Sequence, residues 1–368
     1  MSIDVGIIGL AQSGKTTVFN TLTRGSAATT GHAPEGMTPH VGVAKVSEPR
    51  LPQLAGLFPD KKLVPAEVRY TDIGASVKSL VADKGIGGEL LNRLSAADAL
   101  INVVRVFTDP TVPHPSGSPD AARDIGTMNL ELAFSDLAIL ERKLERLDVS
   151  LKAAKANERP AFLHEESLLK KLGEALQKET PLRDLPLSAE ETRHITGYQF
   201  LTAKPLLILL NIDEDQLPRE DALTAELGAA VNGERCRLIN LCGKLEMELS
   251  QLEEGAAAEF RKDYGITESG LDRVIRASYE LLGLVSFFTV GSNEIRAWSI
   301  PRDTPAVKAA GKIHSDMERG FIRAEVIRHE ELLACGGLAE ARKRGLLRLE
   351  GRDYAVQDGD VINFLFNV

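Results

Sequence analysis

Residues 9–16 read Gly-Leu-Ala-Gln-Ser-Gly-Lys-Thr and form a complete phosphate-binding loop of the type G-x-x-x-x-G-K-[ST]. The apolar run Val5–Ile8 before it predicts a buried strand, and Thr17–Leu22 after it predicts a helix. Strand, glycine-rich loop and helix are the context that this motif requires. The chain is therefore expected to contain an α/β domain that binds nucleotide phosphates.

Each part of this loop has an expected role at the phosphates. The glycines allow a tight turn that points backbone N–H groups at one phosphate chain, and the helix N-terminus adds partial positive charge. Lys15 is expected to reach the β- and γ-phosphates and to act in catalysis, and the Thr16 hydroxyl to ligate Mg²⁺. Asp72, which ends a strand-like run, is expected to supply a second magnesium ligand. The expected phosphate-binding residues are Gln12, Ser13, Gly14, Lys15, Thr16 and Thr17.

A second group of residues predicts how the base is recognised. Asn211-Ile212-Asp213-Glu214 follows an apolar strand-like run, at the place where a GTPase carries Asn-Lys-x-Asp. Ile212 replaces the Lys whose stem would flank the base, and Glu214 replaces the Asp whose carboxylate would accept both guanine N–H groups. Both changes weaken guanine selectivity, since a mismatched buried polar contact can cost orders of magnitude in discrimination. The residues expected around the base are Asn211, Ile212, Glu214, Cys242 and Gly243.

Composition and charge exclude several classes of protein. The chain has 368 residues, a formal net charge of −9, and 3 cysteines that are not spaced for zinc or for a redox pair. No apolar stretch approaches the ~20 residues of a membrane span. The acidic balance argues against a protein that coats DNA. Because the N-terminus opens directly into a strand, we expect no signal peptide and a cytoplasmic location.

The order of predicted elements indicates three domains. Residues 1–132 and 201–281 alternate strand-like and helix-like segments, which predicts a P-loop NTPase domain. Residues 133–200 between them predict an inserted antiparallel helical hairpin, because leucines recur at 3-4-3-4 spacing and a second leucine-bearing helix follows Pro160. This hairpin either packs on its parent domain or projects toward a partner. The leucines of the first helix are Leu137, Leu140, Leu144, Leu147 and Leu151.

Residues 282–368 predict a small α+β domain. It contains 12 Lys and Arg and 12 Asp and Glu, so the rest of the chain carries the whole net charge. The expected strands are Leu284–Val290, Ile295–Ile300, Tyr354–Val356 and Val361–Phe366, and the expected helix is Glu330–Arg344. Arg342, Lys343 and Arg344 form a basic cluster, which is either a solvated surface of mixed charge or a contact for RNA phosphates.

Longer runs of sequence match a known family. The runs are Gly270–Ala277, Phe287–Thr289, Gly311–Asp316, Gly320–Glu325 and Val356–Val361. With them the chain resembles, nearly end to end, the YchF / Obg-like ATPase subfamily of the translation-factor-related P-loop GTPases. The resemblance implies a GTPase-like domain with an inserted helical hairpin and a C-terminal TGS domain of β-grasp type. It also implies ATP hydrolysis with Mg²⁺ and association with ribosomes. In this family the motif Asn-x-x-Glu, here Asn211 and Glu214, indicates that adenine is accepted as the base.

The loops around the phosphates depart from that family's pattern. The family P-loop reads Gly-x-Pro-Asn-x-Gly-Lys-Ser, and Ala11 and Gln12 stand here for Pro and Asn. Since that Asn helps hold a potassium ion in relatives, the change puts potassium activation in question. The family's Asp-Ile-Ala-Gly is replaced by Asp72-Ile-Gly-Ala75, and the Thr of its first switch aligns with Gly36, with Thr38 two residues on.

Hydrolysis requires a residue that orients the attacking water. Ser76 stands where Ras-like enzymes carry a Gln. The resemblance implies that a His in the loop after the fourth strand takes this role, and His114, within Pro113-His114-Pro115, matches that position. From the residues alone the alternative is an inert, solvated loop histidine.

The sequence thus predicts a P-loop NTPase that prefers ATP, accepts GTP as an alternative, hydrolyses slowly, and acts as a molecular switch on the ribosome or ribosomal RNA. One alternative is a guanine-specific GTPase of the same fold. Another is a nucleotide-gated scaffold that does not hydrolyse, which the departures at Ala11, Gln12 and Ala75 favour. A small-molecule kinase is disfavoured because neither the insertion nor the C-terminal domain forms an evident acceptor site.

Overall fold

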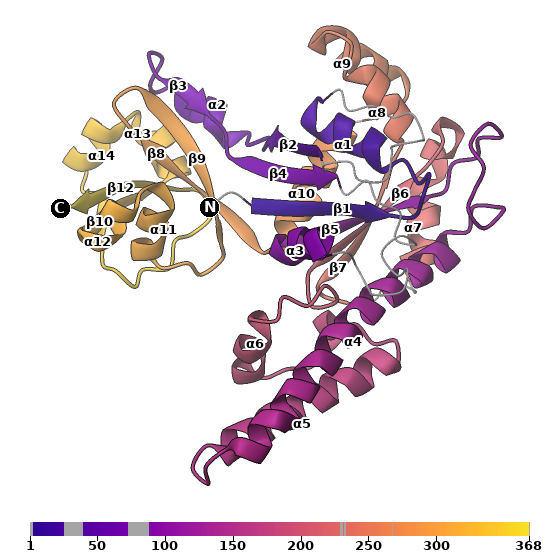
Figure 1. Ribbon diagram of the computed structural model, residues 1–368. Helices are drawn as coiled ribbons and strands as arrows, with labels where there is room; N and C mark the ends of the chain where they lie inside the picture. The colour runs from indigo at the N-terminus through magenta and orange to yellow at the C-terminus, as the bar shows by residue number, and fades with distance from the viewer. Residues whose placement is uncertain are drawn as a thin grey trace. The chain divides into compact units, whose positions relative to one another are not determined.

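The computed structural model describes residues 3–25, 40–72, 88–228, 231, 233–266 and 268–367. The chain divides into two compact units. The larger unit consists of Asp4–Gly42 and Arg69–Ala277, and the smaller unit of Met1–Ile3, Val43–Val68 and Ser278–Val368. The described residues form two six-stranded sheets, and most of their strands are labelled in Figure 1. Within the described ranges no helix combines the length and apolar character that crossing a bilayer requires.

The sheet of the larger unit has the strand order β2-β4-β1-β5-β6-β7. Its strands are β1 (Ile3–Gly9), β2 (His40–Lys45), β4 (Glu67–Asp72), β5 (Ala99–Arg105), β6 (Leu206–Asn211) and β7 (Cys236–Leu241). The pairs β1–β5, β5–β6 and β6–β7 are parallel. Every residue of β5 and β6 is buried, because helices cover both faces of a parallel sheet. Parallel strands bring the loops after β1, β5, β6 and β7 to one edge.

Helices of the larger unit build its core and an extension from it. They are α1 (Lys15–Thr23), α3 (Gly88–Ala96), α4 (Ala121–Ala153), α5 (Arg159–Gln177), α6 (Ala189–Thr196), α7 (Glu220–Gly228), α8 (Gly243–Leu249), α9 (Glu254–Asp263) and α10 (Gly270–Leu281), with 3₁₀ turns η2 (Leu182–Asp184) and η3 (Glu214–Arg219). One apolar cluster joins Met128 of α4 and Leu245 of α8 to strand residues such as Leu100 and Ile208. Burial of these side chains fixes α4 against the sheet.

The expected helical hairpin is present. Helix α4 runs unbroken for 33 residues, and α5 returns alongside it with Pro160 in its first turn (Figure 1). Leu140 and Leu147 of α4 are buried against Leu172 of α5, and the other leucines of the predicted spacing pack on the same cluster. The helix begins at Ala121, ahead of the expected insertion, so its first turns belong to the sheet's core and its remainder to the hairpin.

The smaller unit holds a mixed sheet of order β11-β10-β12-β8-β9-β3. Its elements are α2 (Arg50–Ala55), β3 (Lys62–Val64), β8 (Leu284–Val290), β9 (Glu294–Pro301), α11 (Ala306–Ile313), α12 (Ser315–Arg319), β10 (Phe321–Arg328), α13 (His329–Cys335), α14 (Leu338–Lys343), β11 (Arg348–Glu350) and β12 (Asp360–Phe366). Its core packs Ala306 and Ala310 of α11 against Phe287, Val326 and Phe364 of the sheet.

Residues 43–68 belong to this smaller unit although they precede it by more than two hundred positions. Strand β3 pairs in parallel with β9, placing Leu63 opposite Ile295. Arg50 donates to Asp358 at 2.7 Å and to Glu48, and its guanidinium lies 5.4 Å from the centre of the Phe288 ring. The compact units therefore divide the chain differently from the expected boundaries at 132, 201 and 282.

Two expectations for the C-terminal region were wrong. The predicted helix Glu330–Arg344 is two helices, because Gly336 and Gly337 take φ values of 84° and 143° that end α13. Tyr354–Val356 is no strand but an irregular segment with one isolated bridge, Pro305 to Ala355. There the Tyr354 hydroxyl donates to Asp360 at 2.7 Å. Strand β10 was not predicted.

Candidate functional site

The predicted phosphate-binding loop lies between β1 and α1. Gly14 precedes the helix with a φ of 90°, and a Cβ there would lie 2.2 Å from Nδ2 of Asn211, so only glycine fits. Gln12 is exposed with a φ of 60°, and Ser13 is buried. Because Gly14 has no side chain to cap α1, the backbone N–H groups of the first turn remain available to an anion.

Lys15 is held inside this loop. Its ammonium donates to the carbonyl oxygens of Gly9 at 3.0 Å and Leu10 at 2.9 Å, and the residue is 8% exposed. Burial lowers the pKa of Lys15 to about 8, opposed by the nearby carboxylate of Asp72. A cation desolvated in this way gains from an anionic partner. The loop therefore presents a charge that a phosphate would complement.

Thr16 and Asp72 are brought together as the sequence predicts for metal ligands. The Thr16 hydroxyl donates to Oδ2 of Asp72 at 2.9 Å, although the two residues are 56 positions apart. Burial raises the pKa of Asp72, while the Thr16 hydrogen bond, Lys15 and His40 oppose the rise. Its other oxygen, Oδ1, is buried and unpaired within the described part of the chain. A hydroxyl and a carboxylate with a spare oxygen fit a hard cation such as Mg²⁺.

Asn211 connects the phosphate loop to the predicted base loop. Its Nδ2 donates to the Ser13 carbonyl at 3.0 Å, and its Oδ1 accepts from the Gly243 backbone N–H at 3.1 Å. The residue is 4% exposed. Thr17 closes the same cluster, since its methyl lies 3.6 Å from where a Cβ of Gly243 would be. One buried amide thus sets the spacing of two loops.

The other residues expected at the base take different positions. Ile212 is 2% exposed and packs into the apolar core, so it does not present its side chain on the surface of the site. Glu214 is half-buried at the start of η3. Cys242 is buried just before α8, and burial raises the pKa of its thiol. Their contacts with a base stay predictions.

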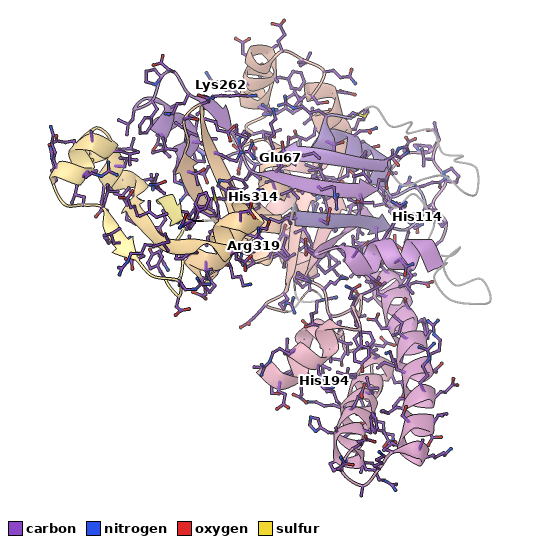
Figure 2. All side chains as sticks on the ribbon, turned by 60° about the vertical axis from the view of Figure 1, so that its left-hand side comes forward. Glu67, His114, His194, Lys262, His314 and Arg319 are labelled. Carbon is purple, nitrogen blue, oxygen red and sulfur yellow. The ribbon has the colours of Figure 1, made fainter. Side chains whose placement is uncertain are left out.

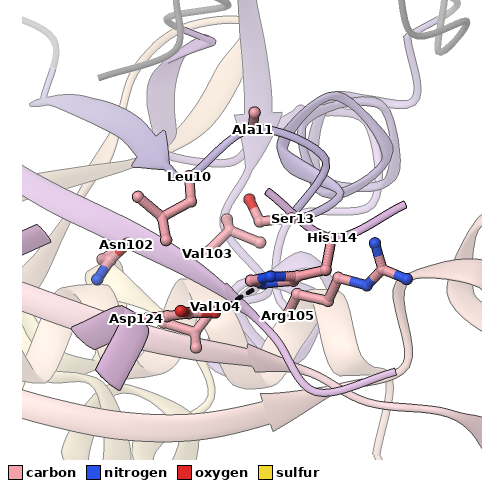
Figure 3. A pocket seen from close by; sticks show the side chains of 9 residues that line it. All are labelled: Leu10, Ala11, Ser13, Asn102, Val103, Val104, Arg105, His114 and Asp124. Atoms are coloured by element: carbon pink, nitrogen blue, oxygen red, sulfur yellow. Dashed lines mark hydrogen bonds and ion pairs between the residues drawn. The ribbon is translucent and has the colours of Figure 1, made fainter. Parts of the chain in front are cut away.

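His114 is not a solvated loop histidine. It lies near the arrowhead end of β1 in Figure 2 and contacts Asp124, with 2.9 Å between Nε2 and Oδ2. The side chains of the two residues are 2% and 4% exposed. Both line a small pocket beside the phosphate loop (Figure 3). Its lining residues are Leu10, Ala11, Ser13, Asn102, Val103, Val104, Arg105, His114 and Asp124.

Sequence reasoning did not predict two residues of this site, Asp124 and Arg105. Asp124 belongs to no motif, since it lies ten positions after His114 and on a helix, and its only signal is that it is an acidic residue in the first turn after the helix cap Asp120. Arg105, at the end of β5, has a buried Nη1 without a partner among the described residues, and burial lowers its pKa. The departures at Gly36, Thr38, Ala75 and Ser76 lie outside the described residues.

Comparisons with known proteins cover the whole chain. Residues 284–367 match the family model YchF-GTPase_C, "Protein of unknown function (DUF933)". The chain is 40% identical over 370 residues to the ribosome-binding ATPase YchF of Bacillus subtilis and 38% identical over 368 residues to that of Escherichia coli O157:H7, each covered completely on both sides. The solved structure of the Schizosaccharomyces pombe YchF GTPase matches with a TM-score of 0.83 at 27% identity, covering 99% of this chain and 98% of that one.

Proposed function

This chain belongs to the YchF family of P-loop nucleotide hydrolases, and from that premise we propose that it hydrolyses ATP as a ribosome-associated switch. The observation that carries the proposal is the contact between Thr16 and Asp72 beside the buried ammonium of Lys15. These groups would hold the phosphates and Mg²⁺, which when bound supplies positive charge to the phosphate oxygens. Lys15 would offset the negative charge that develops as water attacks the γ-phosphorus in line.

We propose ATP as the preferred substrate. Glu214 follows the Asn211 clamp at the position where a GTPase reads guanine with a shorter Asp. Isothermal calorimetry should show ATP binding at least as tightly as GTP, and Glu214→Asp should shift the preference toward GTP. Ile212 is left unchanged in this test, because a Lys there would bury its charge in the core. A large preference of the natural chain for GTP would favour the guanine-specific alternative.

We propose that His114 assists the attack of water. It shares the pocket beside the phosphate loop with Ser13 and Leu10, which supports the role. His114→Ala should lower the turnover of ATP while leaving ATP affinity nearly unchanged, as expected for a group that acts in the transition state. The scaffold alternative has support too, because both ring nitrogens of His114 are engaged in this structure. Absence of phosphate release, with and without ribosomes, would favour that alternative.

Ribosome association is proposed for residues 282–368 as a TGS-type domain, and with it a cytoplasmic location. Arg342, Lys343 and Arg344 are exposed, but each faces a carboxylate, Glu325 or Glu340. Binding through phosphates should weaken as salt rises, because counterions are released. Co-sedimentation with ribosomes should be reduced by changing the three basic residues to Gln in the full chain.

The hairpin offers a matched control for that experiment. Lys152, Lys170 and Lys171 are likewise exposed and paired, and changing them to Gln removes the same charge from α4 and α5. If only the hairpin variant pellets poorly, the hairpin and not the C-terminal domain is the ribosome contact. ATP turnover by the isolated protein should be the same in both variants, since neither set includes a residue of the proposed nucleotide site.

A further inference from the structure

The loop that carries His114 is anchored to the first turn of α4. Asp124 accepts from Nε2 of His114 through Oδ2, and through Oδ1 it accepts from Nε and Nη2 of Arg123 at 3.0 and 2.9 Å. Arg123 also donates to the Ser118 carbonyl at 2.7 Å. Both carboxylate oxygens are therefore engaged, and the carboxylate is fixed relative to the loop. Figure 3 shows the histidine ring directed at this carboxylate.

The hydrogen bonds determine which ring nitrogen of His114 carries the proton. The backbone N–H of Ser116 donates to Nδ1 at 3.1 Å, so Nδ1 is an acceptor and bears no proton. Nε2 then carries the hydrogen and donates it to Asp124. A carboxylate on one ring nitrogen selects the tautomer and leaves the other nitrogen as the basic one.

We propose that Asp124 is the positioning residue for His114 in hydrolysis, an inference that rests on the proposed catalytic role of His114. In this step a water molecule replaces the Ser116 N–H as the hydrogen-bond donor to Nδ1 of His114. Nδ1 then accepts a proton from the water while the oxygen of the water bonds to the γ-phosphorus. The bond from the γ-phosphorus to the β–γ bridging oxygen breaks, and the electron pair leaves with ADP. Asp124 stays ionised and stabilises the imidazolium that forms.

The test replaces the carboxylate and keeps its shape. Asp124→Asn should lower turnover by roughly 10-fold or more, since general-base catalysis contributes at least that much, with KM changed by less than about twofold. ¹⁵N NMR of the imidazole should show the Nε2–H tautomer in the natural chain and a loss of that preference in Asp124→Asn. Among the 7 histidines, the signal of His114 is assigned by its absence from His114→Ala.

Asp120→Asn is the matched control. Asp120 is four residues earlier and caps α4 by accepting from the Arg123 backbone N–H, and Asn can cap equally well. This variant removes the same charge from the same helix end without touching His114, so tautomer and turnover should match the natural chain. The double variant Asp124→Asn with His114→Ala should turn over no more slowly than His114→Ala alone.

The outcomes distinguish a failure of this inference from a failure of the proposed catalytic role of His114. Full turnover by His114→Ala contradicts the catalytic role of His114 and the inference together. Low turnover by His114→Ala with natural turnover by Asp124→Asn overturns the inference alone, even if the tautomer has shifted. If Asp124→Asn does not fold, Asp124→Glu keeps a carboxylate on the same turn. It should keep the tautomer and turn over faster than His114→Ala, and turnover as low as that of His114→Ala overturns the inference.

Discussion

The phosphate-binding loop and the His114 loop line the same pocket, but different forces hold them. The phosphate loop is shaped by backbone conformation, with positive φ at Gln12 and Gly14 and with Lys15 bound to its carbonyl oxygens. The His114 loop is shaped by side chains, chiefly the contact of His114 with Asp124. A loop shaped by its own backbone keeps its conformation when neighbouring side chains change. A loop held by side-chain contacts can instead be released when a single hydrogen bond is lost.

This difference suits the two tasks proposed for the loops. Phosphate binding needs N–H groups held in place before the ligand arrives, since preorganised donors need no further ordering. Orienting water requires His114 to exchange the Ser116 N–H for a solvent molecule, so its loop must move. The following predictions test whether the phosphate loop depends on backbone shape and the His114 loop on side-chain contacts.

The largest difference between the two loops is expected from Gly14→Ala compared with Gly117→Ala. The two glycines, one in each loop, have φ values of 90° and 89°. At Gly14 a Cβ would meet Asn211 at 2.2 Å, while at Gly117 nothing lies within 4 Å. Gly14→Ala should therefore weaken ATP binding on the order of 100-fold, combining backbone strain with displacement of the clamp.

Gly117→Ala carries only the backbone strain, about 1 kcal/mol, and should leave ATP affinity unchanged. Calorimetry of ATP binding and thermal unfolding of both variants measure the two effects separately. Equal loss of ATP affinity in the two variants would contradict the view that crowding around the phosphate loop makes glycine necessary there.

The next effect is a change in stability that depends on pH. Burial lowers the pKa of Lys15 from 10.5 to about 8, so between these values the unfolded chain binds more protons than the native chain. The free energy of unfolding should then rise with pH from about 8 toward 10.5, and at pH 7 the buried charge should cost about 3 kcal/mol. Lys15→Met should abolish ATP binding and yet be more stable than the natural chain at pH 7 without nucleotide.

Urea denaturation at several pH values checks that expectation. The stability advantage of Lys15→Met should shrink as pH rises above 8, because Lys15 of the natural chain then loses its proton. Lys244→Met serves as the control, since it removes an ammonium that is exposed rather than buried. A Lys15→Met variant less stable than the natural chain at pH 7 would mean that the ammonium stabilises the loop even without phosphate.

A smaller effect is expected from Asn211→Ala. The change leaves the Gly243 N–H and the Ser13 carbonyl without their partner, at about 1–3 kcal/mol for each buried group. Because the clamp connects two loops, affinities for ATP and GTP should fall together, by about 10-fold or more. Calorimetry with both nucleotides decides the point, and a loss confined to one of them would show that Asn211 reads the base.

Features encoded by local sequence were predictable. The strand–loop–helix at Gly9–Thr16 is confirmed because it depends on spacing and on glycine, and the hairpin because leucine periodicity is a local signal. The docking of residues 43–68 on the C-terminal sheet was not predictable, since β3 has 3 residues and its partner β9 begins 230 positions later. Pairing at such separation leaves no periodic signal.

The same distinction applies to the site. The proximity of Thr16 and Asp72 followed from a known motif, and the structure brings them into hydrogen-bond distance. Burial of Ile212 was not evident, because the strand end on which it lies also reads as a loop. The environment of His114 was missed because its neighbours Pro113 and Pro115 are typical of exposed loops, whereas its burial depends on Asp124 of a helix.

The smallest effect is expected at the edge of the His114 loop, from Arg123→Gln. Arg123 donates to Asp124 and to the Ser118 carbonyl, but its side chain is 36% exposed. A pair this open to solvent is worth at most about 1 kcal/mol, so turnover should fall by no more than about fivefold while ATP affinity stays the same. Arg142→Gln, which changes an exposed arginine further along α4, should have no effect on turnover. If Arg123→Gln instead lowers turnover as far as Asp124→Asn does, the loop is held by the ion pair as a whole, and the histidine contact alone would not explain its position.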